Sequence, residues 1–454
     1  MIKIPKSLVL FGTSDPPTSN GIEITANEEV TVYVMNDVAF DSVDGYLALP
    51  VHVLGTEYYV VSSSISTIIA EQYRYSEFVV LGSHDNTTVT VNVTGDVSFN
   101  GKLYNKGDVV TFSLQTRETA QFQSGNFDLT GTHVTADKPF GLISGSKCTN
   151  IPTASQFCDH LVEQIPPVSA WGTTFVTTPL LGRFAGDVFR IVASRSNTFF
   201  NISGNYGNHT LDAGDFLEID VPSTDSLLIS SDRPLLVMQY SKGGEVDNTK
   251  SDPFMVLVVP FQQYSGSVTF ATLNYTGGES GKDKITLDNH LNVNIKCDDI
   301  TALNHNHQSI LRNQLTWRLN VGGSDYCSAQ LDIAHGLHTI SHTDNKVKYS
   351  VVLHGWGSTV SYGFPVGMQV ATLWCKRLTD DGDTEEYYCG PIEEDDWLDT
   401  RLLLGICIIV LIIVILIAII LIIGLSIYIH ALKKRNETLH KKHKNAEAEK
   451  AVSI

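Results

Sequence analysis

Positive charge is scarce in this sequence of 454 residues. Lysine and arginine together number 31, against 49 aspartate and glutamate residues, so the formal net charge is −18 with histidine neutral. Most of such a surface would repel a polyanion. The composition therefore argues against nucleic acid as a partner.

Long stretches of helix-forming residues are also missing from most of the chain. Segments such as 88–94 and 109–114 instead alternate apolar and polar side chains, as strands with one buried face do. Glycine, asparagine and aspartate separate these segments at short intervals. We expect an all-β fold of tandem antiparallel units, most simply β-sandwich-like, with a propeller-like arrangement as the alternative.

Catalytic and metal-binding motifs are absent as well. No serine lies in the G-x-S-x-G pattern of a nucleophile elbow, and the glycine-rich stretch 278–283 has Asp283 where a phosphate loop needs Ser or Thr. No two cysteines have the C-x-x-C spacing of a zinc site. The acidic stretch 380–386 lacks the spaced ligands of a calcium loop. The sequence therefore predicts no cofactor, no metal and no enzymatic activity.

Three sequence elements recur in the same order along the chain. The corresponding pairs are 83–87 with 194–198, 106–109 with 213–216, and 137–147 with 232–242. The last pair opens with a polar Asp-[Lys/Arg]-Pro turn that leads into an apolar strand. Correspondences in a fixed order indicate a repeat. We expect four units, at about 1–75, 76–185, 186–266 and 267–375.

The first of these units is incomplete. It lacks a counterpart of the opening strand 77–82, although 55–62 fits its closing strand. The first twelve residues also contain no apolar core adequate for a signal peptide. We therefore expect an upstream export signal and the missing strand in the underlying transcript.

One long apolar run is present, at 402–429, and it contains no charged residue. At about 1.5 Å rise per residue it exceeds the roughly 30 Å of a bilayer core. The preceding stretch 376–401 is rich in acids and the tail 430–454 is basic, and basic flanks stay in the cytoplasm. The sequence predicts one transmembrane helix, with 1–375 and an acidic stalk outside, in a single-pass plasma-membrane protein.

Six of the seven cysteines precede this run, and an even number indicates disulfides in an oxidising compartment. Fifteen pairings of six cysteines remain possible. We expect sequential pairing, because each pair then lies within one unit or its immediate extension. The expected pairs are Cys148 with Cys158, Cys297 with Cys327, and Cys375 with Cys389.

N-glycosylation sequons support the same extracellular placement. The candidate acceptors are Asn86, Asn92, Asn201, Asn208 and Asn274. All five lie in polar, turn-like surroundings. We expect them to carry glycans.

Several motifs together resemble the N-terminal domain of the IgGFc-binding protein family. They are the runs 144–152, 158–167 and 171–172, with further matches at 55–62, 187–193 and 362–368. The resemblance covers about residues 25–370 and implies an extracellular, non-enzymatic domain of mucus and cell-surface proteins. No cysteine-rich von Willebrand type D module follows here, which favours a receptor-like or adhesive role over a gel-forming one.

Two classes of function follow. The first is a cell-surface glycoprotein for recognition or adhesion, which binds an extracellular glycoprotein or glycan, with an immune or mucus component as a candidate ligand. The alternative is an ectoenzyme, a hydrolase that uses Asp159, His160 and Glu163, because His160 and Glu163 would share a face on a helical turn and could transfer protons. His335 and His338 would point to opposite faces of a strand, so we do not expect them to share a metal.

Overall fold

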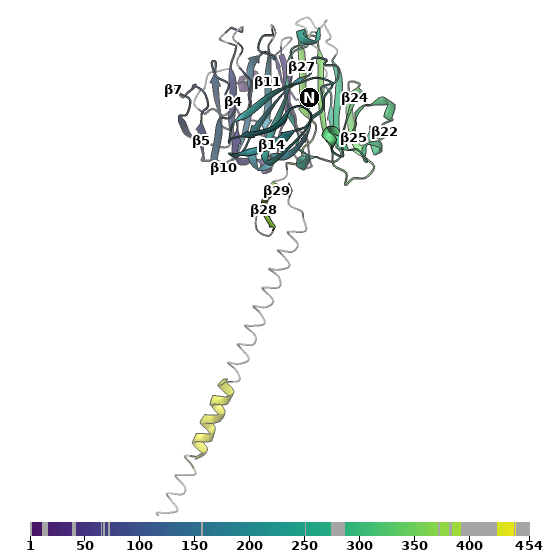
Figure 1. Ribbon diagram of the computed structural model, residues 1–454. Coiled ribbons are helices and arrows are strands. Elements are labelled where there is room, and N and C mark those ends of the chain that lie inside the picture. Colours follow the sequence, from purple (N-terminus) through teal and green to yellow (C-terminus); the bar gives the residue numbers. More distant parts are fainter. Residues whose placement is uncertain are drawn as a thin grey trace, which may run out of the picture. The chain divides into compact units, whose positions relative to one another are not determined.

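The computed structural model describes most of residues 2–391 and a C-terminal segment at 425–439 and 441 (Figure 1). The gaps before residue 391 are 11–16, 39–41, 65, 67–68, 71–72, 156–157, 250, 274–286, 371–372 and 381–383. Residues 1–391 form one compact unit, and 392–454 form another. The first unit consists of β-strands and short 3-10 helices, which confirms the all-β prediction for this part of the chain.

The first repeated module is built on one long strand, β10 (His133–Thr149). Strand β10 pairs with β3 (Gly55–Tyr59), β4 (Ser76–Gly82), β5 (Thr87–Asn92) and β11 (Asp159–Ile165). At the two edges of the sheet, β8 (Val109–Leu114) pairs with β5, and β9 (Thr119–Ser124) pairs with β4. The first part of β10 pairs with β3 and β5, and the second part pairs with β4 and β11. A small hairpin of β6 (Val97–Phe99) and β7 (Lys102–Tyr104) follows β5 in the chain.

The second module repeats this strand order on another long strand, β17 (Leu228–Ser241). Strand β17 pairs with β12 (Gly172–Val176), β13 (Asp187–Ala193), β14 (Thr198–Ile202) and β18 (Met255–Val258). At the two edges of the sheet, β15 (Gly207–Leu211) pairs with β14, and β16 (Phe216–Val221) pairs with β13. The first part of β17 pairs with β12 and β14, and the second part pairs with β13 and β18. The two modules therefore share one topology.

In the third module the long strand is divided in two. One sheet contains β19 (Val268–Ala271), β25 (Leu337–His342), β21 (Leu303–His305) and β22 (Gln308–Ser309). The other contains β23 (Thr316–Arg318), β24 (Tyr326–Ile333), β20 (Asp288–Lys296), β26 (Ser350–Gly357) and β27 (Val360–Pro365). Strands β25 and β26 occupy the places of the two parts of β17.

The repeated Asp-[Lys/Arg]-Pro motif lies where the long strand changes partners. Proline has no N–H for a ladder hydrogen bond, so the strand bends there. Asp137 accepts a hydrogen bond from the backbone N–H of Thr88 (2.8 Å), and Asp232 accepts one from the backbone N–H of Phe199 (2.9 Å). The repeat therefore preserves a contact as well as a residue pattern.

Four strands, β2 (Ser42–Leu47), β11, β18 and β27, form what we call the central ring. Strand β2 packs against β11 and β27, and β18 packs against the same two strands. After β2, β11 and β18 the chain makes a short 3-10 helix that a proline precedes, and then enters the next module. The strands thus surround a common axis.

The N-terminal part of the chain closes this ring. Strand β1 (Tyr33–Val38) forms a hairpin with β2. The Tyr33 hydroxyl donates a hydrogen bond to the carbonyl of Val366 (2.6 Å), and the Tyr33 ring stacks on Phe364 at 4.9 Å between centroids. Segments more than 300 residues apart in the sequence therefore meet beside β27.

Buried apolar side chains form three large clusters, because alternate side chains of the strands point inward. The first cluster joins the first module to Val192 and Met238 of the second. Strand β4 shows the alternation clearly, with every second residue buried. Phe78 and Phe122 stack in the first cluster at 4.8 Å. This apolar packing holds in place the strands that form the central ring.

The predicted membrane segment needs a correction. Most of 402–429 lies outside the described residues, which resume at 425; residues 425–439 are helical. This described helix rises only about 22 Å and carries Lys433, Lys434 and Arg435. Along the parts of the chain that the structure describes, no helix has both the length and the apolar character to cross a bilayer. This finding contradicts the predicted single-pass plasma-membrane localisation, which we withdraw.

The predicted stalk begins with a hairpin. Strand β28 (Leu373–Asp380) pairs with β29 (Thr384–Pro391). The rest of the stalk and most of the tail lie outside the described residues.

Candidate functional site

The Asp44 carboxylate lies at the axis of the central ring and is fully buried. It accepts hydrogen bonds from the backbone N–H groups of Gly45 (2.8 Å), Val162 (3.0 Å) and Met255 (3.3 Å). The backbone N–H of Gly363 also donates to it. These four donors come one from each strand of the ring.

This arrangement makes Asp44 a structural centre. Burial raises the pKa of Asp44, whereas the four backbone hydrogen bonds favour the ionised form and lower it. A carboxylate whose oxygens already accept several backbone hydrogen bonds has little capacity left to bind a substrate. The site therefore holds the strands in register.

The Asp159, His160 and Glu163 group lies beside this centre, on β11. The expected shared face of His160 and Glu163 assumed a helical turn. In a strand, residues three apart point to opposite faces. The His160 ring instead contacts the Ser146 carbonyl through Nδ1 (3.0 Å) and the Asn36 amide nitrogen through Nε2 (2.9 Å). The structure does not bring the proposed proton-transfer pair together.

The two carboxylates of this group contact the protein interior. Asp159 accepts hydrogen bonds from the Ser42 hydroxyl and from the backbone N–H of His160. Glu163 accepts one from the backbone N–H of Leu257 (2.9 Å) in β18. Burial raises the pKa of both carboxyl groups. These contacts join neighbouring strands of the ring, and neither carboxylate faces solvent.

The pKa of His160 leads to a testable pH dependence. Burial lowers it to about 4, against about 6.5 in an unfolded chain. The neutral ring stabilises the fold fully above pH 6.5, and this contribution is lost as the pH falls toward 4. We expect the loss to reach about 3 kcal/mol at pH 4.

The measurement is urea unfolding between pH 7 and pH 4 of the wild type and of His160→Asn, whose amide can still donate to the Ser146 carbonyl. The difference between the two proteins isolates His160 from the buried carboxyl groups, which titrate in both. Parallel stability curves would contradict the assignment.

The other histidines that the sequence singled out have separate partners. His338 Nδ1 lies 2.8 Å from His305 Nε2, and His335 Nδ1 lies 3.0 Å from the Thr272 hydroxyl. His342 contacts backbone groups. Among the residues that the structure describes, no three metal-binding side chains form a group.

Comparisons with known proteins place these features in a family. The family model described as IgGFc binding protein matches residues 44–355, which is more than half of the chain. The chain belongs to the IgGFc-binding protein family. The human IgGFc-binding protein is 29% identical over 329 residues, covering 72% of this chain but only 6% of that protein. No solved structure matches.

The family match starts at Asp44 and ends in β26. It thus covers three strands of the central ring, and the fourth, β27, follows directly. The IgGFc-binding protein family is an extracellular binding family, which agrees with the resemblance noted in the motifs.

Two disulfides stabilise this family region. Cys148 is bonded to Cys158 between β10 and β11, and Cys297 is bonded to Cys327 beside β20 and β24. The register of β28 and β29 places Cys375 opposite Cys389. The side chains of that last pair lie outside the described residues, so their bond stays a prediction.

Four of the five sequon asparagines lie on the exposed surface: Asn86, Asn92, Asn201 and Asn208. Asn274 lies outside the described residues. Asn201 and Asn208 are directly opposite each other in β14 and β15, and the Asn201 amide donates a hydrogen bond to the Asn208 side chain (2.6 Å). Solvent can reach all four.

Glycosylation of these positions is a direct prediction. Secreted protein from a eukaryotic host should lose apparent mass when a glycosidase removes N-linked glycans. Asn86→Gln and Asn92→Gln should each remove one glycan. Equal mobility of treated and untreated protein would contradict this assignment.

Sequence reasoning missed a second buried polar centre, at Arg190 in β13. Its guanidinium is bonded to Asp128 (2.7 Å), Glu218 (2.6 Å) and the carbonyl of Ser62 (2.9 Å), and it stacks over Phe216 at 4.3 Å. The ion pairs raise the pKa of Arg190 against the effect of burial. The sequence signal that could have predicted this centre is an arginine between apolar residues of an expected strand. This centre joins the first module to the second.

Proposed function

We propose that this chain is an extracellular recognition module that binds a protein or glycoprotein ligand through its exposed loops. Membership of the IgGFc-binding protein family carries the proposal. The positions of Asp159, His160 and Glu163 support it over the alternative of a hydrolase, because the three side chains make hydrogen bonds within the protein. An adhesive role, with an immune or mucus glycoprotein as ligand, is part of the same proposal.

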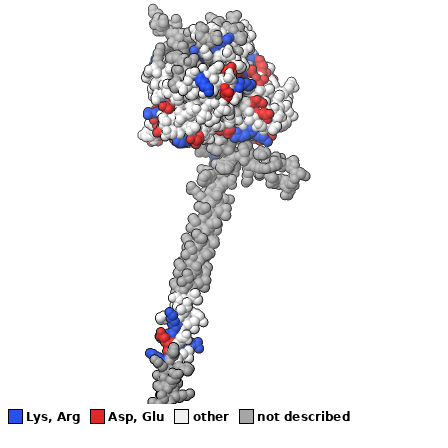
Figure 2. All heavy atoms as spheres, turned by 90° about the vertical axis from the view of Figure 1, so that its left-hand side faces the viewer, with Lys and Arg blue, Asp and Glu red and all other residues white. Residues whose placement is uncertain are grey.

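The surface charge agrees with such a ligand. Figure 2 shows acidic and basic side chains interspersed on one face of the β-region, without a continuous basic patch on that face. A mixed surface of this kind suits a protein partner better than a nucleic acid, which needs clustered positive charge.

We further propose that the chain is organised as four units, near 1–75, 76–185, 186–266 and 267–375, and that the three repeated modules correspond mainly to the last three. Each of the three repeated modules extends loops at the ends of its strands. Loops on a rigid β scaffold are the usual place for binding residues.

Phe184 is the best placed contact residue. Its side chain is 77% exposed, yet its backbone is fixed, because its N–H donates to Asp247 (2.8 Å) and its carbonyl accepts from the Ser223 hydroxyl (2.9 Å). Neighbouring Arg183 is buried and paired with Asp247 (2.8 Å). A rigid, exposed aromatic ring gains contact area on binding with little loss of entropy.

The antibody Fc region is the first ligand to test, since the human relative is named for binding it. Binding of the purified chain to immobilised Fc should be measured by biolayer interferometry. We expect Phe184→Ala to weaken it by about tenfold or more, as loss of a central aromatic contact does.

Leu337→Ala is the matched control, because Leu337 is also exposed, at 71%, but lies in the third module. This variant should bind like the wild type. Wild-type retention on Fc no greater than on an unrelated glycoprotein would refute Fc as the ligand. Equal losses for the two variants would refute Phe184 as the contact.

A further inference from the structure

Five buried nitrogen atoms without a hydrogen-bond partner gather where the second module meets the third. They are Arg183 Nη1, His290 Nε2, both ring nitrogens of His354 and Trp356 Nε1, and none has a partner among the described residues. Arg183 is 2% exposed, His290 7% and His354 0%. Buried polar atoms nearly always have a partner. The cluster therefore points to a ligand.

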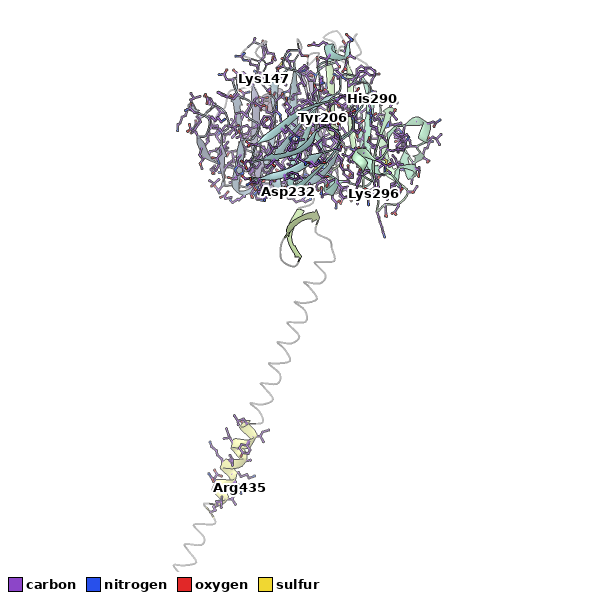
Figure 3. All side chains as sticks on the ribbon, in the orientation of Figure 1. Lys147, Tyr206, Asp232, His290, Lys296 and Arg435 are labelled. Carbon is purple, nitrogen blue, oxygen red and sulfur yellow. A yellow bond between two sulfur atoms is a disulfide. The ribbon has the colours of Figure 1, made fainter. Side chains whose placement is uncertain are left out.

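The residues of this cluster are close neighbours. His290 and His354 lie directly opposite each other in β20 and β26, with ring centroids 5.2 Å apart, and the Trp356 ring lies 6.2 Å from that of His290. His290 is labelled in Figure 3. A Cβ on Gly182 would lie 3.1 Å from Trp356 Nε1. The loop that carries Arg183 thus packs directly on this tryptophan.

The hydrogen-bonding chemistry of these nitrogen atoms indicates whether the ligand is a cation or an anion. The guanidinium of Arg183 and the indole N–H of Trp356 can only donate hydrogen bonds. His354 is free to donate from either ring nitrogen, whereas His290 Nδ1 is bonded to Asp332 (2.7 Å). A cation could not be coordinated by the guanidinium or by the indole N–H, because neither group has an available lone pair. An anion could accept hydrogen bonds from Arg183, His354 and Trp356.

We propose that Arg183, His354 and Trp356 bind a small inorganic anion, with chloride as the extracellular candidate. The anion links the 177–186 loop of the second module to the β20–β26 face of the third. It gives the unpartnered donors a common acceptor.

The surrounding charges make binding dependent on pH. Arg183 is paired with Asp247, Lys242 is paired with Asp220 (2.6 Å), and Asp332 faces His290. Asp187 also lies near, with a pKa raised to about 6 by burial. Burial and the neighbouring His290 and Arg183 lower the pKa of His354. A bound anion favours the imidazolium form, so it should bind more tightly at pH 5.5 than at pH 7.5.

Thermal unfolding of the full chain in sodium chloride and in sodium gluconate, at equal ionic strength, tests the proposal. We expect the melting temperature to rise with chloride and to stay constant with gluconate, more steeply at pH 5.5. Trp356→Phe removes one donor and keeps most of the ring volume, and should raise the chloride midpoint about tenfold. Trp317→Phe, on β23 of the same sheet, should leave the midpoint unchanged.

A crystal grown in sodium bromide adds a readout that does not depend on any variant. An anomalous peak within hydrogen-bond distance of Arg183 Nη1 and Trp356 Nε1 supports the proposal. Ordered water alone at that place overturns it. Equal melting curves in chloride and gluconate also overturn it, as does stabilisation by zinc that a chelator reverses, since that result assigns the histidines to a metal.

Discussion

Asp44→Ala is expected to destabilise the fold by about 3–5 kcal/mol, or to prevent secretion altogether. The change leaves backbone N–H groups of all four central strands buried without an acceptor, and each such loss costs about 1–3 kcal/mol before water or rearrangement offsets part of it. Urea unfolding followed by tryptophan fluorescence measures the effect.

Two further variants make this test specific. Asp137→Ala removes an exposed carboxylate that accepts one backbone hydrogen bond, from Thr88, and should cost about 1 kcal/mol. Asp44→Asn keeps the size and one acceptor oxygen, and should fall between the two alanine variants. Equal effects of Asp44→Ala and Asp137→Ala would rule out a special role for the ring centre.

Arg190→Ala should have an effect of similar size at the junction of the first two modules. It leaves Asp128 and Glu218 without their cation, and removing one partner of a buried ion pair costs about 3–5 kcal/mol. We expect about 3 kcal/mol, because the two carboxylates are 18% and 44% exposed and regain some hydration.

Arg195→Ala is the matched control for this prediction. Arg195 is 49% exposed and paired with Glu57 at the surface, and exposed ion pairs contribute about 0–1 kcal/mol. Unfolding of both variants, with Asp128→Asn to complete a double-mutant cycle, measures the coupling. A coupling energy near zero between Arg190 and Asp128 would contradict the proposed junction.

Local sequence patterns predicted the strands because the causes of the strands are local. The alternation at 88–94 corresponds to β5, and the Asp-[Lys/Arg]-Pro motif marks the bend of β10 and of β17. The position of both cysteines within one expected unit likewise predicts the pairing of Cys148 with Cys158. In each case, the residues that determine the structure are near neighbours in the sequence or recur at corresponding positions of the repeated units.

The central ring could not be read in the same way. Asp44 stands in a short strand with a glycine beside it, and its partners Val162 and Met255 come from segments more than 100 residues away. Likewise, the sequence pattern places 55–62 at the close of the first expected unit, whereas β3 pairs with β10, which lies in the range of the second expected unit. The assumption of a helical turn at His160 failed because packing against neighbouring strands decided the local structure.

Closure of the ring by β1 and β2 has a consequence for synthesis on the ribosome. The contact between Tyr33 and Val366 spans 333 residues, so the hairpin that is translated early must wait for β27 before its final neighbours exist. Folding that depends on such distant contacts is slow, and an unpaired strand edge is prone to aggregate in the interval. A nascent chain that stalls before residue 360 would therefore expose the flanks of β2 and β18 that β27 covers, and we expect chaperones of the secretory pathway to retain it.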